Sequence, residues 1–208
     1  MKSETSSKLK PKSNGKYKYL KEKSILYNEK DEYSLTKEEF CRLYAFYVTY
    51  SMCGSQSMKK RTFIDYGWDS NNVYELVNHH RVKTKLGNAL CSAYVLNNDN
   101  FCFISTEDDL SECFRKCNLL DGRLVDYDTE RAVIKSTQES NKYMKLFYRV
   151  RDGFAHGKFI LKYSSNHEKM IIIQDDDSSN VTARIVLKLS TLLKFIEVID
   201  LAQIIDLD

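Results

Sequence analysis

The stretch FYRVRDGFAHGKF, residues 147–159, decides how the rest of the chain is interpreted. It holds an arginine, an aspartate and a histidine within six residues, and Gly157 follows at once. Upstream of it, apolar residues recur in steps of three and four, which predicts one long helix from a cap at Asp128 to about Ala155. Gly157 stands where helices favour a left-handed terminating residue. The polar residues are therefore expected on the last turn of the longest helix.

These side chains suit RNA cleavage without a metal. Histidine exchanges protons near neutral pH, and arginine is a permanent planar cation that fits phosphate oxygens. We expect His156 to act as acid or base on the ribose 2′-hydroxyl and Arg151 to stabilise the charge that develops at phosphorus. Asp152 can orient either of them. Arg149 lies seven residues before His156, on the same helix face, and is expected to assist substrate binding.

The spacing of the two main residues raises a geometric question. On an ideal helix Arg151 and His156 lie about 140° apart around the axis. For both to reach one phosphate, either the last turn loosens near Gly153 or a second subunit supplies part of the site. A structural interpretation stays open, in which the helix dipole favours His156 at this end and Arg151 pairs with an acidic residue.

Elsewhere the pattern alternates between helical and strand periodicity. Helices are expected from a cap at Ser34 or Thr36 to about residue 52, over 73–96 and 107–119, and after a cap at Ser190, whereas Phe101–Ile104 is an apolar stretch of uncertain type. The segments KFILKY, KMIIIQ and VTARIVLKL alternate as strands of an antiparallel meander over about 157–189. The predicted fold class is α+β, mainly α: an up-and-down helical bundle with a small β-meander inserted before the C-terminal helix.

Charge divides the chain into two parts. Residues 1–23 hold eight Lys and two Glu, so although the whole chain carries +3, the rest is mildly acidic. We expect a basic arm over residues 1–30, either disordered and solvated or able to attract a polyanion, followed by one domain over 31–208.

Several classes of protein and site are disfavoured. No apolar run approaches the roughly 18 residues of a membrane span, and no secretory signal precedes the domain, so we expect a cytoplasmic protein with reduced thiols and no membrane association. The pairs His79-His80 and Cys113/Cys117 lack the spacing of zinc knuckles, and we expect no metal and no cofactor.

The motif RDGFAHG resembles the R-x4-6-H signature of the HEPN superfamily (higher eukaryotes and prokaryotes nucleotide-binding). With the VTARIVLK segment that follows, it is similar to a plasmid-encoded branch whose motif reads Arg-Asn-hydrophobic-Ala-His-Gly before a small sheet. Arg151 and His156 match the two signature residues and Asp152 the polar one. Aspartate stands here where the family more commonly has asparagine.

The resemblance implies an all-helical core and a metal-independent endoribonuclease that leaves a 2′,3′-cyclic phosphate on its RNA. It also implies a homodimer with two motifs across one composite cleft, and a toxin–antitoxin or antiviral defence setting with an antitoxin or regulatory partner. The alternative that it leaves open is a non-catalytic HEPN module that binds RNA, a nucleotide or a protein partner.

Overall fold

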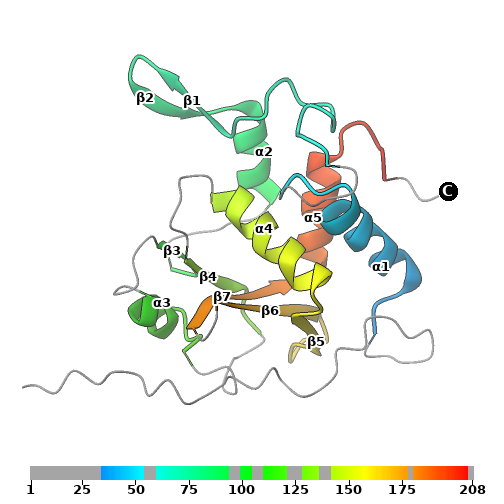
Figure 1. Ribbon diagram of the computed structural model, residues 1–208, viewed down its shortest axis with the longest axis vertical. Helices are drawn as coiled ribbons and strands as arrows, with labels where there is room; N and C mark the ends of the chain where they lie inside the picture. The colour runs from blue at the N-terminus through cyan, green and yellow to red at the C-terminus, as the bar shows by residue number, and fades with distance from the viewer. Residues whose placement is uncertain are drawn as a thin grey trace, which may run out of the picture.

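The computed structural model describes residues 34–53, 60–93, 99–104, 110–120, 128–135, 142–177 and 180–205. These residues form a mixed α+β structure built on a five-stranded sheet, with helices on both of its faces (Figure 1). The expected mainly helical up-and-down bundle is therefore wrong, because a mixed sheet lies at the centre of the core. The basic arm expected over residues 1–30 lies outside the described residues.

The sheet contains the expected meander and two further strands. Its strand order is β3-β4-β7-β6-β5, in which β5, β6 and β7 follow one another as antiparallel neighbours. β4 adds antiparallel to β7, and β3 adds parallel to β4 at the edge. The strands are β3 (Phe101–Ile104), β4 (Arg131–Lys135), β5 (Phe159–Tyr163), β6 (Lys169–Asp177) and β7 (Asn180–Lys188).

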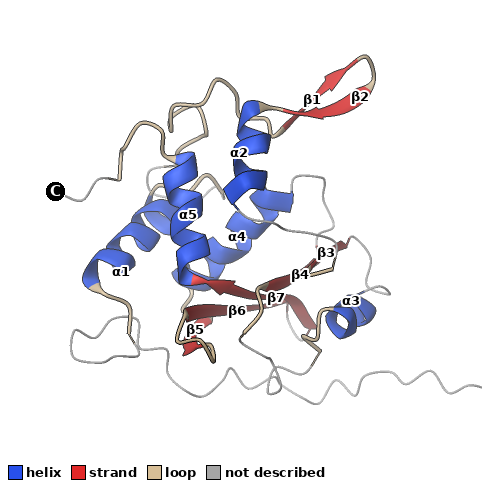
Figure 2. Ribbon diagram, turned by 180° about the vertical axis from the view of Figure 1, so that it is seen from behind, coloured by secondary structure: helices blue, strands red, loops and turns tan. Residues whose placement is uncertain are grey.

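Apolar residues cover both faces of the sheet. Successive residues of a strand point to opposite sides, so neighbouring apolar residues belong to different core clusters. Ile171 and Ile185 belong to the larger core cluster, which includes most of the helices. Ile172 and Val186 belong to a smaller cluster with helix α3 (Leu110–Lys116). Figures 1 and 2 show α3 alone on its side of the sheet among the described helices. Burial on both sides explains why residues 170–173 of β6, MIII, are a continuous apolar run.

The larger face is covered by the remaining described helices. One of the two caps predicted for the first helix is confirmed: the Thr36 hydroxyl accepts from the Glu39 N–H at 3.1 Å, and the Glu39 carboxylate accepts from the Thr36 N–H at 2.8 Å. The helices are α1 (Lys37–Tyr44), which continues into a π-helical turn, η1 (Ala45–Thr49), then α2 (Lys85–Ala93), α4 (Lys142–Ala155) and α5 (Leu189–Ile199).

The helix expected over 73–96 is wrong in its first half. The chain there forms a two-stranded hairpin of β1 (Tyr74–Val77) and β2 (His80–Lys83), which projects beyond α2 (Figure 1). Asn78 and His79 form its turn with φ of 50° and 66°. Two left-handed residues are what the tightest hairpin turns require, and asparagine adopts that conformation readily. The hairpin turn at these two residues therefore decides the local structure, although the flanking apolar residues have helical spacing.

The longest expected helix is also shorter than predicted. Residues 131–135 form strand β4, and the helix begins only at Lys142. Ala132, Val133 and Ile134 are fully buried because β4 lies between two other strands and both of its faces are covered. A short run that is apolar throughout fits a central strand and a buried helix equally well, so periodicity alone cannot separate the two.

Two smaller expectations are corrected as well. The last helix begins at Leu189 with Lys188 as a cap that makes no side-chain hydrogen bond, so Ser190 is not its cap. The helix expected over 107–119 is described only as α3. In the part of the chain that the structure describes, none of the helices combines the length and the hydropathy needed to cross a bilayer.

Candidate functional site

Helix α4 brings the Arg-Asp-His stretch to the surface while its other side packs on the sheet. Gly153 is buried against β6, where a Cβ atom would lie only 2.7 Å from the Ile173 Cγ2 atom. Real Cβ contacts are longer, so this close approach requires glycine. Gly153 therefore fixes the last turn of α4 against the sheet, and of the two alternatives that the sequence leaves open, a loosened turn at Gly153 is not seen, since the α-helix continues to Ala155.

The end of α4 is regular and closed by hydrogen bonds. The Lys158 N–H donates to the Gly153 carbonyl at 2.8 Å, and the Gly157 N–H donates to the Phe154 carbonyl at 3.4 Å. Gly157 has φ of 63°, so it is the left-handed terminating residue that the sequence predicts. This pair of bonds is a Schellman motif. The separation of about 140° between Arg151 and His156 is thereby kept within one chain.

Arg151 and Asp152 form an ion pair that is largely shielded from solvent. Arg151 Nη1 lies 2.7 Å from Asp152 Oδ1, with side-chain exposures of 12% and 13%. The Nε atom of Arg151 is buried and has no hydrogen-bond partner among the described residues. Of the two roles that the sequence left to Asp152, the structure shows the pairing with Arg151. This ion pair also fits the alternative in which Arg151 has only a structural role and pairs with an acidic residue.

His156 is exposed on the opposite side of this turn. It follows the last residue of α4, and its backbone N–H donates to the Asp152 carbonyl at 3.0 Å. Its side chain makes no hydrogen bond with another described residue, so the imidazole is accessible to a solute. The structure therefore presents the histidine and largely covers the arginine of the motif.

Arg149 belongs to a separate charged network between α4 and β6. Its guanidinium pairs with the Asp175 carboxylate and also donates to the Lys135 carbonyl at 3.2 Å. Lys158 Nζ lies 3.2 Å from Asp175 and 2.9 Å from Asp176. Hydrogen bonding to Asp176, with a further contribution from Asp175, raises the pKa of the Lys158 ammonium. Arg149 is thus paired with Asp175, and its expected role in substrate binding stays a prediction.

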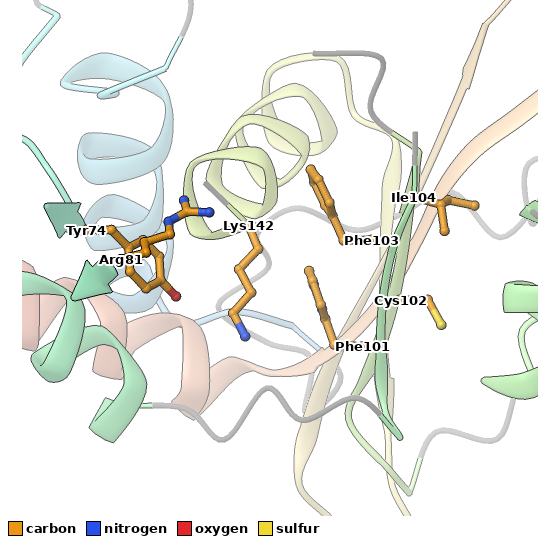
Figure 3. Close-up of a pocket in the computed structure, with 7 residues that line it drawn as sticks. All are labelled: Tyr74, Arg81, Phe101, Cys102, Phe103, Ile104 and Lys142. Carbon is orange, nitrogen blue, oxygen red and sulfur yellow. The ribbon is translucent and has the colours of Figure 1, made fainter. Parts of the chain in front are cut away.

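A second polar region lies at the other end of α4. A cavity of about 390 Å³ is lined by Tyr74, Arg81, Phe101, Cys102, Phe103, Ile104 and Lys142. Figure 3 shows the Phe101 and Phe103 rings on the same side of β3 as Tyr74, Arg81 and Lys142, whereas Cys102 and Ile104 point to the other side. None of these residues was predicted as a site residue. The only signal in the sequence is the alternation of Phe101 and Phe103.

A polarised cysteine lies close to this cavity. The Tyr143 hydroxyl donates to Cys91 Sγ at 3.1 Å, and Lys83 of β2 also hydrogen-bonds the thiol. Burial raises the pKa of Cys91, but the hydrogen bonds of Tyr143 and Lys83 outweigh it, and the net shift is downward. Burial raises the pKa of Cys53 to about 12, so the pKa values of these two thiols are shifted in opposite directions.

No three His, Cys, Asp or Glu side chains are grouped to hold a metal ion anywhere in the described ranges. Cys117 is buried beside Cys102 and Cys113, and burial is the main reason why its pKa is raised to about 12. A thiol that resists deprotonation is a poor ligand.

Comparisons of the chain with models of protein families, with curated proteins and with solved structures find no match.

Proposed function

We propose that the protein is a metal-independent endoribonuclease whose active site combines Arg151 of one protomer with His156 of a second copy. The observation that carries this proposal is the exposed His156 ring on a helix end that cannot bring Arg151 to the same side. The HEPN resemblance of the motif supports the same chemistry. The described residues form a sheet-based core and not the helical bundle that this resemblance implies, so the proposal rests on the motif residues.

The reaction needs only the groups of the motif. The His156 imidazole removes the proton of a ribose 2′-hydroxyl, and the oxygen attacks the adjacent phosphorus. Arg151 stabilises the added negative charge on the phosphoryl oxygens. The bond from phosphorus to the 5′-oxygen then breaks, that oxygen takes up a proton from water, and His156 releases its own proton to solvent. The products are a 2′,3′-cyclic phosphate and a 5′-hydroxyl end.

The first test is RNA cleavage by single variants. His156→Ala and Arg151→Ala are each expected to abolish cleavage while the thermal unfolding transition stays cooperative. His167→Asn is the matched control, because His167 is exposed in the β5–β6 turn at a φ of 61° that asparagine tolerates. The proposal fails if either alanine variant cleaves as fast as the control, with the same cyclic phosphate product.

The second test asks whether the two residues act from different chains. Neither alanine variant is active alone, but a mixed dimer retains one intact pairing of Arg151 with His156. Random exchange makes half of the dimers mixed, each with half of its sites intact, so the mixture should recover about a quarter of the wild-type activity. No recovery in a mixture shown to exchange subunits would contradict a site built from two chains.

A second candidate function is RNA binding without cleavage. The Arg151–Asp152 ion pair favours it, because the carboxylate competes with phosphate for the guanidinium. RNA binding that survives in His156→Ala, with no cleavage by the wild type, would select this function. A toxin–antitoxin or antiviral defence setting, with an antitoxin or regulatory partner, remains part of the proposal on the motif resemblance alone.

A further inference from the structure

The cavity beside β3 is assembled from three separate parts of the chain. Phe101 and Phe103 are alternate residues of the edge strand β3, so their rings point to one side (Figure 3). Tyr74 and Arg81 come from the β1–β2 hairpin, and Lys142 is the first residue of α4. The helix spans about 20 Å, so the cavity lies far from the Arg151–His156 end.

Aromatic rings and cations are held together in its wall. The Arg81 guanidinium carbon lies 4.2 Å from the centroid of the Tyr74 ring. Lys142 Nζ lies 5.9 Å from the centroid of the Phe101 ring and 5.5 Å from that of Tyr143. These are cation–π distances, and they place both charges beside aromatic rings.

The charge of the lining is of one sign. Two of its seven residues are cations and none is a carboxylate, so the cavity attracts anions. Its aromatic surface suits a flat ring, because bases stack on aromatic side chains with little regard to sequence. The volume of about 390 Å³ matches a small ligand or one unit of a polymer, not a folded element.

We propose that this cavity binds one nucleotide, with its base against the aromatic side chains and its phosphate between Arg81 and Lys142. Two sources share this chemistry: a free nucleotide and one residue of a single-stranded RNA. This site goes beyond the ribonuclease proposal and does not depend on it, since none of its residues belongs to the Arg-Asp-His motif.

The test measures binding, separately from cleavage, to the full-length protein. Adenosine monophosphate is titrated by calorimetry, and a fluorescein-labelled single-stranded RNA is titrated by anisotropy against His156→Ala protein. Each pocket variant, Phe103→Leu, Arg81→Gln and Lys142→Gln, is expected to weaken binding by about 5- to 100-fold, as for loss of one stacking or charged contact. Phe103→Leu keeps apolar volume and removes only the ring.

Arg115→Gln is the matched control, because Arg115 is an exposed cation on α3, which packs on the face of the sheet opposite to the cavity. It should bind both probes as the parent protein does. Binding of the monophosphate alone assigns the site to free nucleotides, and tighter binding of RNA assigns it to a strand. The inference is overturned if neither probe binds, or if all three pocket variants bind as Arg115→Gln does.

The outcomes also separate the two proposals. Loss of binding in the pocket variants, together with an inactive wild type, would support the nucleotide site and contradict the ribonuclease. The opposite result is RNA cleavage that requires His156, together with cleavage and binding that are unchanged in every pocket variant. It would support the ribonuclease and contradict the nucleotide site. Thermal unfolding of each variant checks that a loss of binding is not a loss of fold.

Discussion

Gly153 fixes the position of the motif, although it carries no functional group. All three atoms nearest to its missing Cβ belong to Ile173. Gly153→Ala should lower the free energy of unfolding by about 1–3 kcal/mol, as overpacking does, despite the better helix propensity of alanine. Urea denaturation measures the change.

A double variant isolates the cause of that loss. In an Ile173→Ala background the clash is gone, and Gly153→Ala should then raise the free energy of unfolding by up to about 1 kcal/mol through helix propensity. The same loss in both backgrounds would show that the helix–strand contact is not responsible.

Cys91 illustrates how two neighbours set the reactivity of one thiol. Because its pKa is lowered, its alkylation by iodoacetamide should reach a plateau at lower pH than that of a free thiol, and at pH 7.5 it should outpace Cys53. Lys83→Gln should slow Cys91 severalfold by removing one stabilising charge, whereas the exposed Lys85→Gln should not. Peptide mass spectrometry gives the rates, and equal rates for Cys91 and Cys53 would contradict the prediction.

At the scale of elements, Glu130 joins the start of β4 to the β7–α5 junction. Its carboxylate accepts from the Lys188 N–H at 2.8 Å, and burial raises its pKa. A raised folded-state pKa contributes stability that is present below the unfolded value, near 4.3, and is lost as pH rises through the folded value. At pH 7 the ionised carboxylate is therefore a cost to stability.

Glu130→Gln keeps the acceptor oxygen and removes the charge. The variant should gain stability relative to the wild type at pH 7, and this gain should shrink as the pH falls toward 4. Glu112→Gln is the control of opposite sign, because hydrogen bonding from Arg115 lowers the pKa of Glu112. Chemical denaturation at several pH values measures both differences, and a pH-independent difference for Glu130→Gln would refute this account.

Elements with a distinctive terminator or with polar turn residues on both sides were the predictable ones. Gly157 was identified as a helix end because few residues adopt a positive φ. The strands of the meander were recognised as short apolar segments separated by polar turn residues, although β6 and β7 are buried on both faces. β4 was missed because its three central residues are all apolar and buried on both faces of the sheet, so polar and apolar residues do not alternate along it. The β1–β2 hairpin was missed because its apolar residues, such as Leu76 at 79% exposure, lie at helical spacing without facing a core.

At the scale of the whole molecule, sites made by one segment were accessible to sequence reasoning and composite sites were not. Arg151, Asp152 and His156 lie within one turn and a half, so their relative directions follow from helix geometry. The cavity requires β3, the hairpin and the start of α4 to meet, and no local pattern encodes that meeting. Whether the arginine of the motif is covered or exposed also depends on tertiary packing.

The strand order has a consequence for the growing chain. β5, β6 and β7 follow one another in the chain with only a few residues between them, so they can pair as soon as they are made. β4 precedes them in the chain yet hydrogen-bonds to β7, the last strand, and β3 depends on β4. During synthesis from the N-terminus, β3 and β4 are therefore made before the other strands of the sheet but join it last. The aromatic wall of the cavity is completed only after nearly the whole described chain has left the ribosome.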